Sequence, residues 1–132
     1  MTDPHATPNT EDCLTVGPLT LTDFVRYAGA SGDFNPLHHD DAFARDAGFP
    51  GPFAMGMFSA GLIGAWLSRQ ADPRRLRRLR VRFEQQVWPQ DILTVSGTRS
   101  SPPHTNGDEY TIECRRSDGA LVSRGWALLV DS

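Results

Sequence analysis

The stretch PFAMGMFSAGLIGAWL, residues 52–67, is the longest apolar run in this chain of 132 residues. Its apolar positions go nearly all the way round a helix, so it predicts a helix from about Phe53 to Gln70 that other structure encloses. The run is shorter than the roughly 20 residues that a bilayer span needs, and three glycines weaken it further as a span. A buried helix in a globular protein is therefore favoured over a transmembrane one.

Alternating patterns follow this run. In LRVRFEQQVW, residues 79–88, Leu79, Val81 and Phe83 fall on one face of a strand, whereas Arg80 and Arg82 fall on the other. Three more strands are predicted at 91–99, 109–116 and 120–130. An Asp-Gly pair at 118–119 favours a tight hairpin before the last strand, and 100–108 is expected to be a loop.

Two short helices are predicted ahead of the apolar run. Thr20 and Asp23 have the spacing of a capping box, and glycines at 29 and 32 are expected to end that helix. A second helix is predicted from Asp40 or Asp41 to Ala47. The economical architecture is α+β, an antiparallel sheet wrapped around one long apolar helix. It leaves a sheet edge open, which dimerisation would cover.

Composition limits the class of protein. An apolar fraction of 39% is ordinary for one globular domain, and a net charge of −3 argues against a nucleic-acid partner. Residues 1–12 are polar and acidic, and we expect a disordered tail there, with one domain over 13–132. No leader or membrane segment is visible, so the expected location is cytoplasmic. Cys13 and Cys114 are interpreted as free thiols, although a disulfide between them stays open.

Titratable side chains gather in SGDFNPLHHD, residues 31–40. Asp33 and His38 lie five apart, a spacing that a continuous helix or a strand would not bring together. A turn stiffened by a proline, with Asn35 and Ser31 as its support, can aim both side chains at one point. A carboxylate and an imidazole that meet on one water molecule can hold it and move its protons near neutral pH.

The start of the apolar helix supplies a second candidate element. Free N–H groups at a helix N-terminus stabilise negative charge that develops on an oxygen. Gly56 has no side chain to hinder a ligand near its N–H, so Gly56 and Met57 are candidate oxyanion and substrate contacts.

The run from Pro18 to Gly64 resembles the MaoC-like dehydratases, a hotdog-fold family that includes (R)-specific enoyl-CoA hydratases. It looks most similar to the B subunit of (3R)-hydroxyacyl-ACP dehydratases. The family's acid and histidine pair falls on Asp33 and His38 within SGDFNPLH, and its backbone donor falls on Gly56 in FAMGMFSAG. Two positions depart from the family pattern: Met55 replaces a usual His, and Gln90 replaces the Gly of a Pro-Gly-Asp turn.

The resemblance implies a single hotdog fold and a subunit pair with active sites at or near the interface. It also implies the activity: reversible hydration of a trans-2-enoyl thioester, or dehydration of the (R)-3-hydroxyacyl thioester, on coenzyme A or acyl carrier protein, with no cofactor. Whether the partner is a second copy or a related hotdog subunit stays open. Two alternatives remain, a hotdog acyl thioesterase and a non-catalytic subunit of a heterodimeric dehydratase.

Other interpretations of the same residues compete with these functional roles. A zinc site built from residues 33, 38, 39 and 40 is disfavoured, because neighbouring histidines seldom converge on one ion, so no metal is expected. His39 is expected to be structural or exposed. The arginine-rich run 73–82 is either a solvated face or a contact for coenzyme A phosphates or an acidic carrier, with Arg80 and Arg82 as the candidates.

Overall fold

The computed structural model describes residues 12–100 and 106–131. Residues 1–11 of the expected tail, and residues 101–105 of the expected loop, lie outside this part. Asp12 belongs to the folded unit, because its backbone carbonyl accepts a hydrogen bond from the indole N–H of Trp66. The strand before the loop continues to Ser100, and the strand after it begins at Gly107. Both strands therefore reach into the segment 100–108 that was predicted as a loop.

The sheet has five antiparallel strands in the order β1-β3-β4-β5-β2. The long strands are β2 (Leu76–Phe83), β3 (Leu93–Ser100), β4 (Gly107–Arg116) and β5 (Leu121–Val130). These four are the predicted strands. The fifth, β1 (Leu14–Val16), pairs with β3 and was not predicted, because three residues carry no alternation that could be recognised.

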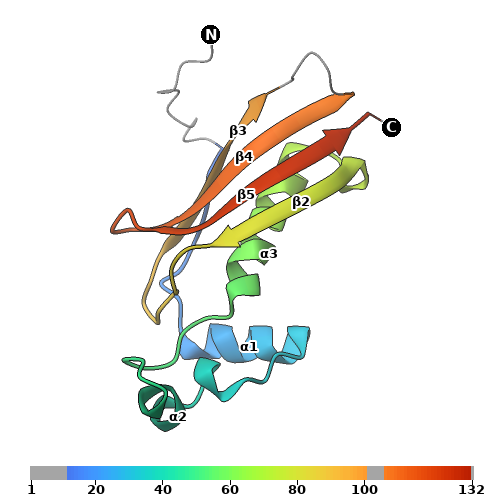
Figure 1. Ribbon diagram of the computed structural model, residues 1–132. Coiled ribbons are helices and arrows are strands. Elements are labelled where there is room, and N and C mark those ends of the chain that lie inside the picture. Colours follow the sequence, from blue (N-terminus) through green and yellow to red (C-terminus); the bar gives the residue numbers. More distant parts are fainter. Residues whose placement is uncertain (1–11, 101–105, 132) are drawn as a thin grey trace.

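Helix α3 (Gly56–Gln70) packs against β3, β4 and β5 (Figure 1). Ile63, Trp66 and Leu67 are buried at the contact, and each contributes roughly 1.5–3 kcal/mol from the apolar surface it removes from water. The sheet backbone comes so close to the indole that a β-carbon at Gly97 would lie 2.5 Å from Trp66. The α+β arrangement of an antiparallel sheet around an apolar helix is confirmed.

The expectation that this helix would be fully enclosed is wrong for the single chain. Met57 is 60% exposed, and Gly61 and Ala65 on the same helix are exposed as well. The sheet covers one side of α3, and Phe58 near the helix start contacts Phe24 and Tyr27 of α1. The positions of Met57, Gly61 and Ala65 stay exposed among the described residues. The helix also begins at Gly56 and not at Phe53, because the N–H groups of Phe53 and Ala54 are bonded to the carbonyls of Leu37 and Val87.

The first helices lie beyond the end of the sheet at which α3 begins (Figure 1). Helix α1 (Leu21–Ser31) starts with the predicted capping box of Thr20 and Asp23 and ends at Gly32, whose φ is 75°. Gly29 lies inside this helix and does not end it. Helix α2 (Asp41–Asp46) begins after the Asp40 cap, as predicted. Two short 3₁₀ helices, η2 (Pro36–His38) and η3 (Pro73–Arg75), are also present among the described residues.

The turn between β2 and β3 has the hydrogen bond of a β-turn from the Asp91 N–H to the Trp88 carbonyl. Pro89 and Gln90 are its central residues, and Gln90 has φ 75°. A proline followed by a residue of positive φ is the pattern of a type II turn, in which glycine is the usual second residue. This turn therefore keeps its shape although a glutamine holds the glycine position.

In the part of the chain that the structure describes, no helix is long and apolar enough to cross a membrane.

Candidate functional site

Asp33 and His38 face each other. The Nε2 atom of His38 lies 3.7 Å from Oδ2 of Asp33. The imidazole is almost buried, with 9% of the side chain exposed, whereas 46% of the Asp33 side chain is exposed. The two side chains therefore lie close together, as expected. His38 is enclosed by the protein, whereas Asp33 is open to solvent.

The turn that brings them together is held by short-range hydrogen bonds. The Asp33 N–H donates to the Ser31 hydroxyl at 3.3 Å, and the Asn35 N–H donates to Oδ1 of Asp33 at 3.3 Å. The Asn35 side chain in turn accepts from the Leu37 N–H and caps η2, with Pro36 as its first residue. Ser31 and Asn35 thus lie where turn support was expected, and the Asp33 carboxylate is itself part of the turn.

His38 is oriented by Phe53. Its Nδ1 atom lies 2.7 Å from the Phe53 carbonyl oxygen. Since a carbonyl oxygen can only accept, Nδ1 carries the hydrogen. In this tautomer Nε2 has a free lone pair on the side where Asp33 lies, so a hydrogen-bond donor such as water is needed between the two groups. The Phe53 ring meets the imidazole edge-on, at 5.4 Å between ring centres. Phe53 was not singled out from the sequence, because a backbone acceptor leaves no trace in residue type.

The N-terminus of α3 is uncapped. Met55 is its N-cap residue, and no side chain accepts a hydrogen bond there. The first N–H groups of a helix have no partner within the helix, so those of Gly56 and Met57 are available to a ligand. Gly56 lies three residues after Phe53, a span of at most about 10 Å. The side chain of Met55 therefore does not cap these donors.

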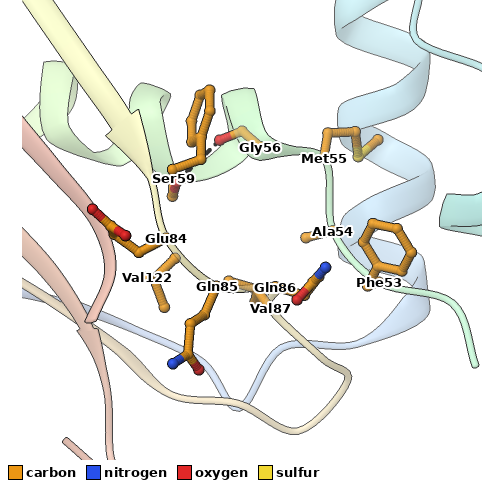
Figure 2. Close-up of a pocket in the computed structure, with 11 residues that line it drawn as sticks. Phe53, Ala54, Met55, Gly56, Ser59, Glu84, Gln85, Gln86, Val87 and Val122 are labelled. Carbon is orange, nitrogen blue, oxygen red and sulfur yellow. Dashed lines mark hydrogen bonds between the residues drawn. The ribbon is translucent and has the colours of Figure 1, made fainter. Parts of the chain in front are cut away.

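A cavity of about 270 Å³ lies beside this helix start (Figure 2). Apolar groups form part of its wall, and Ser59, Glu84, Gln85 and Gln86 supply polar groups. The Ser59 hydroxyl is turned back to the Gly56 carbonyl at 3.0 Å, which Figure 2 draws as a dashed line. Neither Asp33 nor His38 lines this cavity. Phe53 connects the two places, because it lines the cavity and also contacts His38.

The four polar lining residues were missed in the sequence. Glu84, Gln85 and Gln86 follow β2 directly, where an amphipathic strand gives way to three polar residues before the buried Val87. That change of pattern was the available signal. The Phe83 ring lies next to the position that a side chain of residue 56 would occupy, because a β-carbon at Gly56 would lie 3.4 Å from this ring.

The remaining candidates are spread over the surface. Met57 is exposed and lines a groove between α3 and β2. Leu79 and Val81 pack toward the core, so Arg80 and Arg82 lie on the opposite face of the sheet. Arg80 lies over the Trp126 ring at 5.8 Å, and Arg82 pairs with Glu84 at 2.9 Å. Only Arg82 is therefore linked to the cavity, through Glu84.

Other titratable groups take no part in this geometry. His39 is exposed, and among the described residues no group of three or more His, Cys, Asp or Glu is placed to hold a metal ion. Cys114 is a free thiol in the sheet, and its burial raises the pKa to about 11. A thiol with such a pKa is a poor nucleophile at neutral pH.

The MaoC like domain family matches residues 2–119. This chain belongs to that family. The membership expected from the SGDFNPLH motif is thus confirmed, and the fold is the hotdog fold of the MaoC-like hydratases.

Two curated relatives are far longer than the segment that matches this chain. The fatty acid synthase beta subunit aflB of Emericella nidulans is 33% identical over 123 residues, which cover 90% of this chain and 6% of that protein. A probable enoyl-CoA hydratase 2 of Dictyostelium discoideum is 30% identical over 81 residues, 59% of this chain and 28% of that protein. The matched segment therefore spans less than a third of the length of either relative.

A solved structure of an R-hydratase has a similar fold along most of the chain. The R-hydratase PhaJ1 from Pseudomonas aeruginosa superposes with a TM-score of 0.77 at 25% identity, and the match covers 91% of this chain and 79% of that one.

Proposed function

We propose that the chain catalyses the reversible hydration of a trans-2-enoyl thioester, and in the other direction the dehydration of an (R)-3-hydroxyacyl thioester. The single observation that carries the proposal is the Asp33–His38 pair, held 3.7 Å apart in a turn that adjoins the uncapped start of α3. Membership of the MaoC like family and the similarity to a protein named enoyl-CoA hydratase 2 support it.

The gap between the two side chains suits a water molecule. A distance of 3.7 Å is too long for a direct hydrogen bond, whereas one water molecule can bond to both groups. In hydration, Nε2 of His38 takes a proton from this water while its oxygen bonds to C3 of the enoyl group, and Asp33 holds the remaining O–H. The proton then passes from the pair to C2 on the same face, which leaves the hydroxyacyl product and the original protonation states.

The helix start supplies the second element. As oxygen bonds to C3, electrons move through the conjugated system and negative charge builds on the thioester oxygen. The N–H groups of Gly56 and Met57 are fixed donors, which need no reorganisation as the charge develops. The cavity beside Gly56 would receive the part of the acyl group that adjoins the thioester.

The rest of the assignment is coarser. We place the activity on an acyl group carried by coenzyme A or by acyl carrier protein, with Arg80 and Arg82 as candidate contacts to the carrier's anionic groups. The working unit is a pair of hotdog subunits, identical or related, in the cytoplasm. The exposure of Asp33 supports such a pair, because a partner would shield the reacting groups from bulk water.

The same exposure of Asp33 is consistent with a second function, that of a non-catalytic subunit. A subunit in which the carboxylate of the pair is open to solvent is also what a non-catalytic member of a heterodimer would present. Turnover by the chain purified alone separates the two functions. Release of free thiol in place of loss of enoyl absorbance would point instead to a thioesterase.

The direct test uses substitutions that preserve the turn. Asp33→Asn keeps an oxygen to accept the Asn35 N–H, and His38→Asn keeps a nitrogen to donate to the Phe53 carbonyl. Each variant is expected to lower the turnover of crotonyl-CoA, or of a longer enoyl thioester, by about 10²-fold or more, because it removes one proton-transfer group. Loss of enoyl absorbance measures the rate.

His39→Ala is the matched control, since its imidazole is adjacent in sequence but exposed. It should retain the turnover of the unmodified protein. Circular dichroism and thermal unfolding verify that all three variants are folded. Turnover that survives in both Asp33→Asn and His38→Asn would refute the mechanism.

A further inference from the structure

Phe83, the last residue of β2, lies between a cavity and a groove at the start of α3. It lines the cavity of about 270 Å³ beside Gly56, and it also lines a groove of about 380 Å³ between α3 and β2. Among the described residues it is the one that the two linings share. The Phe83 ring is therefore a wall, with the cavity on one side and the groove on the other.

This ring is held close to the start of the helix. Its atoms Cδ1, Cε1 and Cζ would each lie 3.4 Å from a β-carbon at Gly56. Leu79 and Val81, on the same face of β2, pack toward the core, whereas the Phe83 ring is 49% exposed and lies outside the core cluster. Loss of the ring would therefore change the wall and leave the packing of the core in place.

The groove behind the wall suits an apolar chain. Its lining includes Met57, Ala60, Gly61, Leu79 and Val81, and among the described residues it contains no charged side chain. A β-carbon at Gly61 would meet no atom within 4 Å, so there is open space beside the helix at this point. An acyl tail in the groove would remove its methylene groups from water, which is favourable.

The cavity in front of the wall is small and partly polar. Ser59, Glu84 and Gln86 belong to its lining. Its volume is below the roughly 300–1,000 Å³ of pockets that enclose drug-sized ligands, whereas cavity and groove together fall within that range. With the ring in place, the space beside the Gly56 N–H suits a short acyl group.

From this arrangement we propose that Phe83 limits the length of the acyl group that the chain accepts. The ring closes the cavity toward the groove, so the preferred substrates are short enoyl thioesters. A smaller side chain at this position joins the two spaces and admits a long acyl tail to the groove. The inference rests on the proposed function and narrows its substrate class.

Phe83→Ala tests this role. The value of kcat/KM is measured for trans-2-dodecenoyl-CoA and for crotonyl-CoA, and the ratio of the long to the short substrate is the readout. In the unmodified chain this ratio is expected to be well below one. In Phe83→Ala it should rise by about tenfold or more, which is the lower end of the effect of a single methylene group in an apolar pocket.

Val81→Ala is the matched control. Val81 lies on the same face of β2 and lines the groove but not the cavity. Its truncation widens the groove and leaves the wall in place, so the ratio should stay that of the unmodified chain. Circular dichroism verifies folding. If Phe83→Ala is unfolded, Phe83→Leu replaces it, and should raise the ratio in the same direction because leucine has no ring.

Equal kcat/KM for the two substrates in the unmodified chain would overturn the inference. So would a Phe83→Ala protein that loses activity on both substrates alike, because the ring would then have only a structural role.

Absence of turnover at either chain length in the unmodified protein would instead count against the proposed function. Thermal unfolding with saturated dodecanoyl-CoA then tests the wall separately, since a ligand that binds the folded state stabilises it. The thioester should raise the Tm of Phe83→Ala by more than that of the unmodified chain. Equal shifts would overturn the inference.

Discussion

At the scale of single residues, backbone conformation and side-chain identity disagree at one position. Gln90 has φ 75° in a turn that normally takes glycine there. The backbone of this residue is nevertheless fixed from outside the turn, because its N–H donates to the Leu19 carbonyl at 2.6 Å. This hydrogen bond to Leu19 therefore holds Gln90 in a backbone conformation that costs free energy.

Gln90→Gly is expected to raise the free energy of unfolding by roughly 0.5–1 kcal/mol, since relief of the left-handed conformation exceeds the added entropy of the unfolded chain. Urea denaturation measures the change. Gly119→Ala is the opposite control, because Gly119 has φ 89° and open space around it. That variant should be destabilised by a similar amount. A Gln90→Gly protein that is no more stable would show that the turn carries no strain.

The pKa of Cys114 allows a second prediction for a single residue. Burial raises this pKa to about 11, against 9.0 for an ordinary thiol. Only the thiolate reacts with alkylating reagents, so at pH 8 about a thousandth of the folded molecules present it. Modification of the folded protein should rise about tenfold per pH unit up to about pH 11. Cys114→Ser identifies the signal from Cys13, and a profile with a midpoint near pH 9 would show that the site is open.

Among the elements, α3 begins in a way that permits a clean test of its N–H groups. Gly56 is the first helical residue, where proline is tolerated, and Met55 has the extended conformation that a following proline requires. Gly56→Pro therefore removes one N–H and preserves the helix.

Gly56→Pro is expected to lower enoyl thioester turnover by about 10²-fold, the usual effect of losing one oxyanion donor. Gly56→Ala is the matched control: it keeps the N–H, and its β-carbon would make ordinary contact with Phe83 at 3.4 Å. Steady-state kinetics on both variants separate lost donation from altered shape. Equal turnover in the proline and alanine variants would remove Gly56 from the mechanism.

The elements also show which features sequence could predict. The caps of α1 and α2 and the alternation of β2 are local, so they were predicted. The start of α3 was placed too early, because Phe53 and Ala54 suit a helix by residue type. Bonds to Leu37 and Val87, which are remote in sequence, hold them extended.

At the scale of the whole molecule, the same distinction holds for the site. Asp33 and His38 share one short turn, so their meeting was predictable from spacing and a proline. The cavity at Gly56 was not, because its walls come from segments as far apart as Glu84 and Val122. The partial exposure of α3 was also unpredictable, since an apolar sequence does not say which chain covers it.

One feature of the architecture bears on how such proteins diversify. The groups to which we assign the chemistry all lie between residues 31 and 57, outside the sheet, whereas the strands contribute Phe83 and Val122 to the wall of the cavity beside them. Substitutions on the strands can therefore adapt the protein to a different partner subunit or a different acyl group during evolution, while the reaction itself stays the same.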